Sequence, residues 1–103
     1  MLTVPVISVF KVLADENRSK MVWLLGEKEQ TVGELEQALG LSQSSTSQHL
    51  KILTQSGLVS FRKYGNFRIY ALKKEELRAA MSFFDSLWDK GLDRLKQNLE
   101  KNE

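Results

Sequence analysis

Apolar residues recur every three or four positions through the first half of the chain, the spacing of helices that bury one face. Four helices are expected there from this pattern and from the residues that begin and end each segment. The first follows Pro5, a residue suited to a first turn but not to a helix interior, and has the apolar positions Val6, Val9, Phe10 and Leu13.

Polar and glycine residues mark the limits of the next two helices. Asp15 stands at the N-cap position of the second, which Gly26 is expected to end in the left-handed conformation. Thr31 and Glu34 have the spacing of a capping box, so a short third helix begins there and ends at Gly40.

A fourth helix is predicted from Ser42, its N-cap, to about Ser56. Residues 42–48 are rich in Ser and Gln, and their composition alone would favour a flexible linker. Periodicity favours the helix, because Leu50 and Leu53 lie within about 40° of Thr46 on a helical wheel. The opposite side is polar and contains Ser44, Ser47, Gln48, Lys51 and Gln55.

This polar face has two explanations that the helix alone does not separate. Short hydroxyls, amides and one lysine can approach a phosphodiester backbone and hydrogen-bond to base edges. The same residues are also typical of an ordinary solvated surface.

Two segments rich in aromatic and β-branched residues follow, at 58–63 and 67–72, and they are predicted to form a two-stranded hairpin. Gly65 and Asn66 between them tolerate the positive φ of a tight turn. Cationic side chains lie near the tip, either to bind a polyanion or to keep an edge strand from aggregating, and they are Arg62, Lys63 and Arg68.

The helical pattern returns at Glu75 with a long apolar stripe formed by Leu77, Met81, Phe84, Trp88, Leu92, Leu95 and Leu99. A helix of this length has little left to pack on once a three-helix core is closed, so we expect part of the stripe to meet a second copy. Packing within one subunit is the alternative. The first helix is the expected second contributor, and the predicted dimerisation residues are Val6, Phe10, Met81, Phe84, Trp88, Leu92 and Leu95.

Composition narrows the function classes. With 103 residues and 42% hydrophobic content, the chain suffices for one compact domain. It has no cysteine and one histidine, which excludes disulfides, thiolate metal ligands and cysteine nucleophiles. It has no phosphate-binding glycine loop and no hydrolase motif, so no enzyme activity and no cofactor are expected. Lacking a membrane-spanning run and a secretory signal, the chain is expected in the cytoplasm.

Charge is distributed in blocks. The segment from Gln37 to Lys74 contains no acidic residue and has a net charge of +6, whereas each flank has a net charge of −2. A net charge of +2 for the whole chain hides this cationic middle third. One cationic face on a small domain suits a polyanion, and double-stranded DNA is the partner that we expect.

The predicted order of elements is that of a winged helix-turn-helix. Residues 10–18, FKVLADENR, resemble the F-K-A-L-A-D-P-T-R opening of the ArsR-type bacterial repressors. Residues 41–53, LSQSSTSQHLKIL, are similar to that family's recognition helix, L-S-Q-x-x-V-S-x-H-L-K-x-L. The resemblance continues through residues 57–59 and 70–72 and covers nearly the whole chain.

The resemblance implies a DNA-binding role for nine residues of the fourth helix and the wing: Ser42, Gln43, Ser44, Ser47, Gln48, Lys51, Arg62, Lys63 and Arg68. Those of the helix are expected in the major groove, with Ser47 and Lys51 on the backbone. Those of the wing are expected on flanking phosphates or in the minor groove. His49 matches a family position, but it flanks the apolar seam, and we expect a half-buried packing residue there rather than a base reader or a pH sensor.

Two departures from the family pattern concern metals. Metal-sensing members have a Cys-x-Cys pair where this chain has residues 32–34, VGE. Others have Asp and His ligands on the last helix, where this chain has Asp85, Asp89 and Asp93 without histidine. We therefore expect no metal site, and residues 84–96 resemble the F-W-x-x-R-L-D-x-L ending of a metal-independent subgroup. Gly91 departs from that ending, and a kink or a close helix approach is expected there.

The sequence thus predicts a mostly α fold with a two-stranded β wing. We expect one winged helix-turn-helix domain over residues 1–103, in which 75–103 form a dimerisation helix. The expected function is that of a homodimeric repressor on an inverted-repeat operator, with no membrane partner and no identified effector. The alternatives are a winged-helix protein-interaction module and a regulator that responds to a small molecule bound near Phe84 and Trp88.

Overall fold

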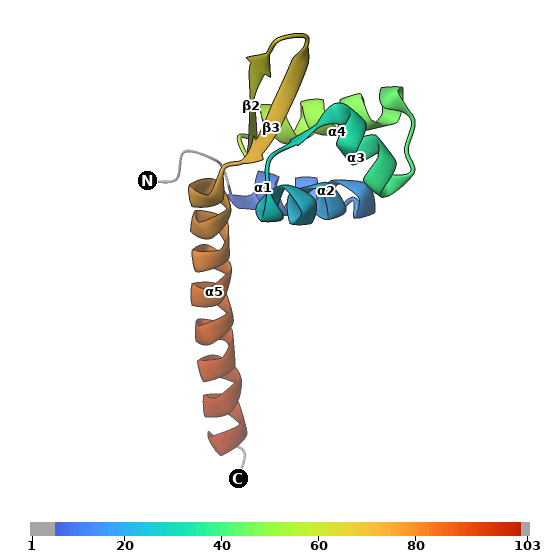
Figure 1. The fold of residues 1–103 in the computed structure, drawn as a ribbon. Helices are drawn as coiled ribbons and strands as arrows, with labels where there is room; N and C mark the ends of the chain where they lie inside the picture. Colours follow the sequence, from blue (N-terminus) through green and yellow to red (C-terminus); the bar gives the residue numbers. More distant parts are fainter. Residues whose placement is uncertain (1–5, 102–103) are drawn as a thin grey trace.

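A computed structural model describes residues 6–101 and has the predicted architecture, mostly α with a β wing. The helices are α1 (Val6–Leu13), α2 (Glu16–Glu27), α3 (Val32–Leu39), α4 (Gln43–Gln55) and α5 (Lys74–Lys101). The strands are β1 (Gln30–Thr31), β2 (Val59–Tyr64) and β3 (Phe67–Leu72). Helices α1 to α4 form the body, the β2–β3 hairpin rises from one side of it, and α5 projects away from it (Figure 1). Pro5 lies outside the described residues.

The predicted helix starts are confirmed by their hydrogen bonds. The Asp15 carboxylate accepts a hydrogen bond from the backbone N–H of Arg18 at 3.0 Å. Thr31 and Glu34 form the expected capping box at the start of α3. Each cap satisfies N–H groups that the first helical turn leaves without partners.

Gly26 does not end α2, contrary to the prediction. The helix continues to Glu27, and its C-cap Lys28 is extended, with its N–H donating to the Leu24 carbonyl. Gly26 instead faces the end of β3, where an added Cβ would lie 3.7 Å from Cδ2 of Leu72. The glycine thus lies in a tertiary contact rather than at a left-handed turn.

Helices α3 and α4 form the predicted helix-turn-helix. Gly40 ends α3 in the left-handed conformation, at φ 66°, and the Ser42 side chain caps α4. The predicted seam of α4 is confirmed, since Thr46, Leu50 and Leu53 are all fully buried. The hydroxyl of Thr46 donates to the carbonyl of Ser42 at 2.8 Å, so this buried polar group is satisfied.

The sheet has one strand more than the sequence predicted. β1 pairs antiparallel with β3 on the side opposite β2, giving the order β1-β3-β2. A strand of two residues shows no alternation that a sequence pattern could detect. The side chain of Gln30 is buried, and its Nε2 donates to the carbonyl of Leu24 at 3.1 Å, which ties β1 to α2.

The core lies where α1, α2, α3, α4 and the base of the sheet meet. Its fully buried side chains include Val9, Met21, Leu35, Leu50, Leu53 and Leu58. The body thereby closes without the distal part of α5, whose residues beyond Ala80 are all exposed where described. None of the helices in residues 6–101 is long and apolar enough to cross a membrane.

Helix α5 is continuous over 28 residues, so the kink considered for Gly91 does not interrupt it. A Cβ added at Gly91 would meet nothing within 4 Å. No close contact within the described chain therefore accounts for a glycine in the middle of this helix.

Candidate DNA-binding surface

The outer face of α4 presents five predicted DNA contacts to solvent. The helix can expose them because its other face is fixed in the core by the buried seam. The five exposed residues are Gln43, Ser44, Ser47, Gln48 and Lys51. Ser42 is exposed too, but its Oγ accepts from the backbone N–H of Ser45 at 3.1 Å. Its first role is therefore that of a cap, although its hydroxyl can still donate to a phosphate.

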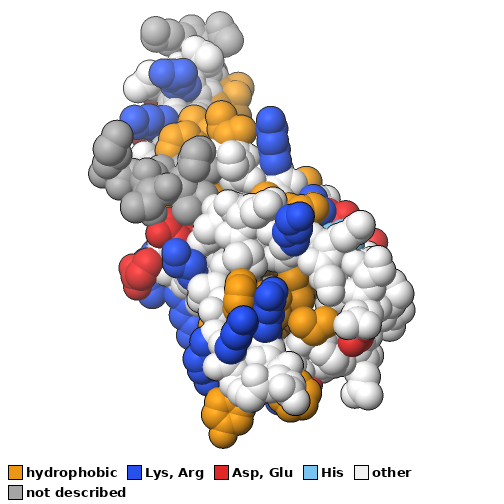
Figure 2. All heavy atoms as spheres, turned by 90° about the horizontal axis from the view of Figure 1, so that it is seen from above, with side chains coloured by type: hydrophobic (Ala, Val, Ile, Leu, Met, Phe, Trp, Pro, Cys, Tyr) orange, Lys and Arg blue, Asp and Glu red, His pale blue; other side chains and the backbone are white. Residues whose placement is uncertain are grey.

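A groove of about 720 Å³ separates α4 from the wing. Polar and cationic residues of both elements line it, namely Gln43, Ser47, Lys51, Asn66 and Arg68. Its remaining lining includes the start of α3 and the aromatic residues Phe61, Phe67 and Tyr70. Glu36 is its one acidic lining residue. Seen from above, Lys and Arg side chains lie beside exposed apolar side chains on this face, while most Asp and Glu side chains lie farther out (Figure 2).

The wing turns on Gly65 and Asn66, and its register places Lys63 opposite Arg68. Only Gly65 uses a positive φ, of 62°, which is typical of a type II′ turn. Strand alternation puts Phe61 on the same face as Lys63 and Arg68. The Arg68 guanidinium lies 4.5 Å from the centroid of the Phe61 ring. Both residues line the groove, so the ring holds a cationic side chain beside it.

Arg62 occupies the other face of the wing. It pairs with Ile69 in the register and forms an ion pair with Glu29, the residue before β1. The structure therefore does not bring Arg62 together with the groove residues. Because both partners of the pair are about half exposed, the pair is a surface contact that contributes little to stability.

Two carboxylates at helix starts have lowered pKa values. The pKa of Asp15 lies below its ordinary value chiefly because the backbone N–H of Arg18 donates to it, with the charges of Arg18 and His49 adding to the effect. The pKa of Glu34 is lowered chiefly by the hydrogen bond from the backbone N–H of Thr31. Both shifts come from the ends of helices that orient α4, not from the groove itself.

Most of the predicted dimerisation residues belong to α5, namely Met81, Phe84, Trp88, Leu92 and Leu95. Phe84 contacts Phe10 of α1 edge to face, with ring centroids 6.0 Å apart, and stacks on Trp88 at 6.4 Å. Trp88 remains 59% exposed and Leu95 56% exposed. Exposed large apolar side chains continue along the helix as Met81, Phe83, Phe84, Leu87, Trp88, Leu92, Leu95 and Leu99. The side chain of Val6 lies outside the described residues.

The sequence analysis missed two contacts of the wing. Phe61 supports Arg68, and Glu29 pairs with Arg62. A signal for the first was present, because a two-residue turn at Gly65 fixes the hairpin register and places Arg68 diagonally across from Phe61. No signal existed for the second, since Glu29 and Arg62 are 33 positions apart.

No group of three His, Cys, Asp or Glu side chains in the described residues is arranged to hold a metal ion. Asp85, Asp89 and Asp93 are exposed along α5. Carboxylates four residues apart on an open helix face are usually solvated.

Comparison with known proteins identifies the same architecture. The sequence model of the bacterial regulatory protein arsR family matches residues 15–60, from the N-cap of α2 into β2. The transcriptional activator HlyU of Vibrio cholerae is 38% identical over 80 residues, which cover 78% of this chain and 74% of HlyU. The arsenical resistance operon repressor of Escherichia coli is 41% identical over 80% of this chain and 71% of its own length.

A solved structure agrees with the fold. The ArsR-like transcriptional regulator from Rhodococcus sp. RHA1 is 30% identical and superposes with a TM-score of 0.75, over 89% of this chain and 90% of that one. The shared region thus includes the wing and much of α5 as well as the helix-turn-helix.

Proposed function

Because this chain belongs to the ArsR family of DNA-binding transcriptional regulators, we propose that it is a homodimeric repressor that binds an inverted-repeat operator without a metal ion. The family is not enzymatic, and its members bind DNA operators. Our proposal goes beyond these family properties in three respects, which are repression, metal independence and the dimer. With a chromosomal target, the protein would act in the cytoplasm.

One observation carries the proposal for DNA. Gln43, Ser47 and Lys51 of α4 line the same groove as Arg68 of the wing. Amide side chains can make paired hydrogen bonds to adenine in the major groove, whereas lysine and arginine neutralise phosphates without reading sequence. A helix that reads bases beside a hairpin that holds the backbone is the arrangement that an operator requires.

We assign the DNA contacts in two groups. The base-reading group is Gln43, Ser44 and Gln48, and the backbone group contains Ser42, Ser47, Lys51, Lys63 and Arg68. Arg62 remains a predicted contact, but its ion pair with Glu29 and its place on the other face make it the weakest of the wing.

The dimer is proposed from the apolar stripe of α5. The molecule extends 65 × 30 × 20 Å because α5 projects from the body, and a lone helix with exposed Phe84, Trp88 and Leu92 would be unusual for a stable monomer. We assign the predicted segment 75–103, of which residues 102–103 lie outside the described residues, to dimerisation of a single domain, with Phe10, Met81 and Leu95 adding to the interface. Two copies of α4 about 34 Å apart would then reach successive major grooves.

Gly91 fits this assignment. It lies among Phe84, Leu87, Trp88, Leu92 and Leu95 around a hollow of about 270 Å³ on α5. A missing Cβ at the centre of an apolar stripe allows a partner helix to approach closely. The alternative occupant of this hollow is a small molecule near Phe84 and Trp88, and we assign the hollow to the second copy instead.

Metal independence rests on the ligand chemistry that the chain offers. It has no cysteine, and its one histidine lies on α4.

Repression is proposed from the simplest mechanism. The related proteins include both an activator, HlyU, and a repressor, the arsenical resistance operon repressor, so their names do not decide between the two. A dimer on promoter DNA blocks polymerase by occupying its site.

A selection experiment tests the proposal. Duplexes chosen by the protein from a random pool would be titrated at about 50 and 200 mM salt, with the unselected pool as control. We expect a palindromic winner that binds at least about a thousandfold more tightly than random DNA, with a steep loss of affinity at the higher salt. Enrichment of a non-palindromic site would contradict the dimer, and no enrichment would contradict operator binding.

A further inference from the structure

The tip of the wing presents two large aromatic side chains to solvent. Tyr64 is 70% exposed and Phe67 is 63% exposed, and the register pairs them directly across the turn at Gly65 and Asn66. Within residues 6–101, neither ring stacks on another aromatic ring or meets one edge to face. Apolar side chains stabilise a fold chiefly by leaving water, so this pair contributes little to the hairpin and is available to a partner.

The base of the wing, in contrast, is fixed to the body. Tyr70 is buried, and its ring centroid lies 5.4 Å from that of Phe61. Leu58, just before β2, is fully buried, and β1 pairs with β3 at Tyr70 and Ile69. The wing therefore rises from the body at a defined place (Figure 1).

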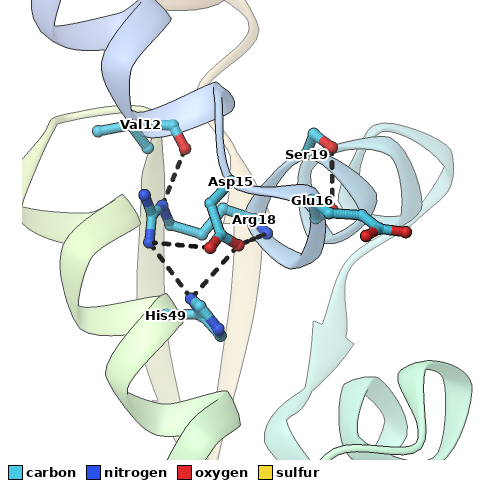
Figure 3. A network of polar contacts seen from close by, with 6 residues as sticks. All are labelled: Val12, Asp15, Glu16, Arg18, Ser19 and His49. Atoms are coloured by element: carbon cyan, nitrogen blue, oxygen red, sulfur yellow. Dashed lines mark hydrogen bonds and ion pairs between the residues drawn. The ribbon is translucent and has the colours of Figure 1, made fainter.

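Helix α4 is tied to the same body through its inner side. Nδ1 of His49 on α4 lies 3.4 Å from Nη1 of Arg18 on α2 (Figure 3). Nε of Arg18 donates in turn to the carbonyl of Val12 in α1 at 2.8 Å. Because α4 and the base of the wing are held by one core, a duplex that lies on α4 meets the wing at a place that the fold determines.

The tip borders the proposed DNA-binding groove and is flanked by cations. Phe67 lines the groove together with Gln43 of α4. Lys63 precedes Tyr64 in the chain and Arg68 follows Phe67. An apolar tip between cations suits a partner with an apolar interior and a phosphate surface, which stacked bases between two phosphate backbones provide. The absence of acidic residues from position 37 to position 74 favours such a polyanion over a protein surface, where charges of both signs are mixed.

The two faces of the wing suit the two walls of a minor groove. Strand alternation puts Lys63 and Arg68 on one face, and Arg62 with the aromatic pair on the other. The minor groove of B-form DNA is roughly 6 Å wide, less than the about 10 Å that a β layer occupies with its side chains. Entry of the tip therefore requires the groove to open. An apolar side chain inserted between base pairs opens it and bends the duplex.

We propose that Phe67, together with Tyr64, is an apolar wedge that enters the minor groove beside the half-site of α4, partly unstacks one base step and bends the operator. This inference rests on the operator binding proposed above. Unstacking costs least at pyrimidine–purine steps such as TA and CA. The wedge thus adds a sequence preference at a position where no side chain reads a base edge.

The test measures the bend of the selected operator duplex by energy transfer between dyes at its two ends. We expect the native protein to bend the duplex by about 20° or more. Phe67→Ala should leave it nearly straight and lower operator affinity roughly tenfold. The slope of log K against log salt should not change, because phenylalanine carries no charge. Phe67→Leu keeps an apolar wedge and should retain most of the bend.

Trp23→Ala is the matched control, since it removes another exposed aromatic side chain, from α2, that does not line the groove. Its bend and affinity should equal those of the native protein. A fluorescent adenine analogue at the flanking step gives a second readout, because its emission rises when the base unstacks. We expect this rise with the native protein and not with Phe67→Ala.

Three results would overturn the wedge. A native protein that binds its operator tightly but leaves it straight would do so while the proposed function stands. A bend that persists in both Phe67→Ala and Tyr64→Ala would do the same and would assign the aromatic tip to a protein partner. If no duplex is selected from the random pool, the proposed function fails and the wedge fails with it.

Discussion

The Arg68 guanidinium lies over the ring of Phe61, 4.5 Å from its centroid, on the face of the wing that borders α4. The ring holds a long, flexible cation in one place, which lowers the entropy lost when a phosphate binds. Among the described residues Arg68 forms no ion pair, whereas Arg62 on the other face is paired with Glu29. If the wing contacts DNA as proposed, the two arginines of this hairpin should therefore differ in how readily they bind a phosphate.

Arg68→Ala should lower affinity for operator and random duplex alike and flatten the slope of log K against log salt by roughly one unit. Arg62→Ala should change the slope less, because its charge is already compensated by Glu29. Equilibrium binding at several salt concentrations measures both. Glu29→Gln is the matched control, since it frees Arg62 and should steepen the slope. A larger effect of Arg62→Ala than of Arg68→Ala would refute this assignment.

Gln43→Ala should reduce the discrimination between operator and mismatched sites by about 1–3 kcal/mol at the base it contacts, with a smaller loss on random DNA. The reason is that an amide reads base edges and carries no charge. Competition binding with single-base operator variants checks it. Gln97→Ala, an exposed glutamine on α5, should leave both affinities unchanged. Equal losses on operator and random duplex would remove Gln43 from base readout.

Leu92→Glu should convert the proposed dimer to a monomer, because it places a charge in the apolar stripe of α5, where Leu92 is 45% exposed in a single chain. Sedimentation equilibrium measures the change, and tight operator binding should be lost with it. Gln97→Glu places the same side chain on the opposite face of α5, away from the apolar stripe, so this control variant should remain dimeric. If Leu92→Glu sediments like the native protein, the dimer does not form through this stripe.

Gly91→Leu should weaken dimerisation although it adds apolar surface. The substitution favours helix by roughly 1 kcal/mol in the monomer, and its Cβ would meet nothing within 4 Å. In the dimer a leucine would separate helices that approach closely at a glycine. The dimer dissociation constant and the helix content by circular dichroism test the two effects. A tighter dimer would show that the partner helix does not cross at this position.

Stability should fall in acid because two capping carboxylates have lowered pKa values, those of Asp15 and Glu34. A carboxyl group with a lower pKa in the folded state contributes its full stabilisation above the unfolded pKa and loses it as pH falls through the folded pKa. The ordinary values are 3.8 and 4.5, so the loss should develop below about pH 4.5. Urea unfolding at a series of pH values measures it.

The controls for this pH dependence are Asp15→Asn and Glu34→Gln. Both amides can still cap a helix but do not titrate, so each should flatten the acid limb of the stability curve. If both variants lose stability in acid as steeply as the native protein, the caps are not the source of the acid sensitivity.

The secondary structure was largely predictable because its determinants are local. Asp15, Thr31 and Ser42 cap helices through N–H groups no more than three residues away. The α4 seam and the Gly65 turn depend on equally short spacings. These signals placed the helix-turn-helix and the wing, and the absence of acidic residues from Gln37 to Lys74 pointed to DNA.

What the sequence by itself determined, therefore, is the order of the five helices and the hairpin, and the residues exposed on α4. Only the tertiary structure decided that Gly26 packs on β3, that β1 joins the sheet, and that Arg62 pairs with Glu29. It also brought His49 to Arg18, 31 positions away. The physical reason is the range of the interactions: caps and periodicity act within a turn or two, whereas these contacts form only when distant segments meet around one core.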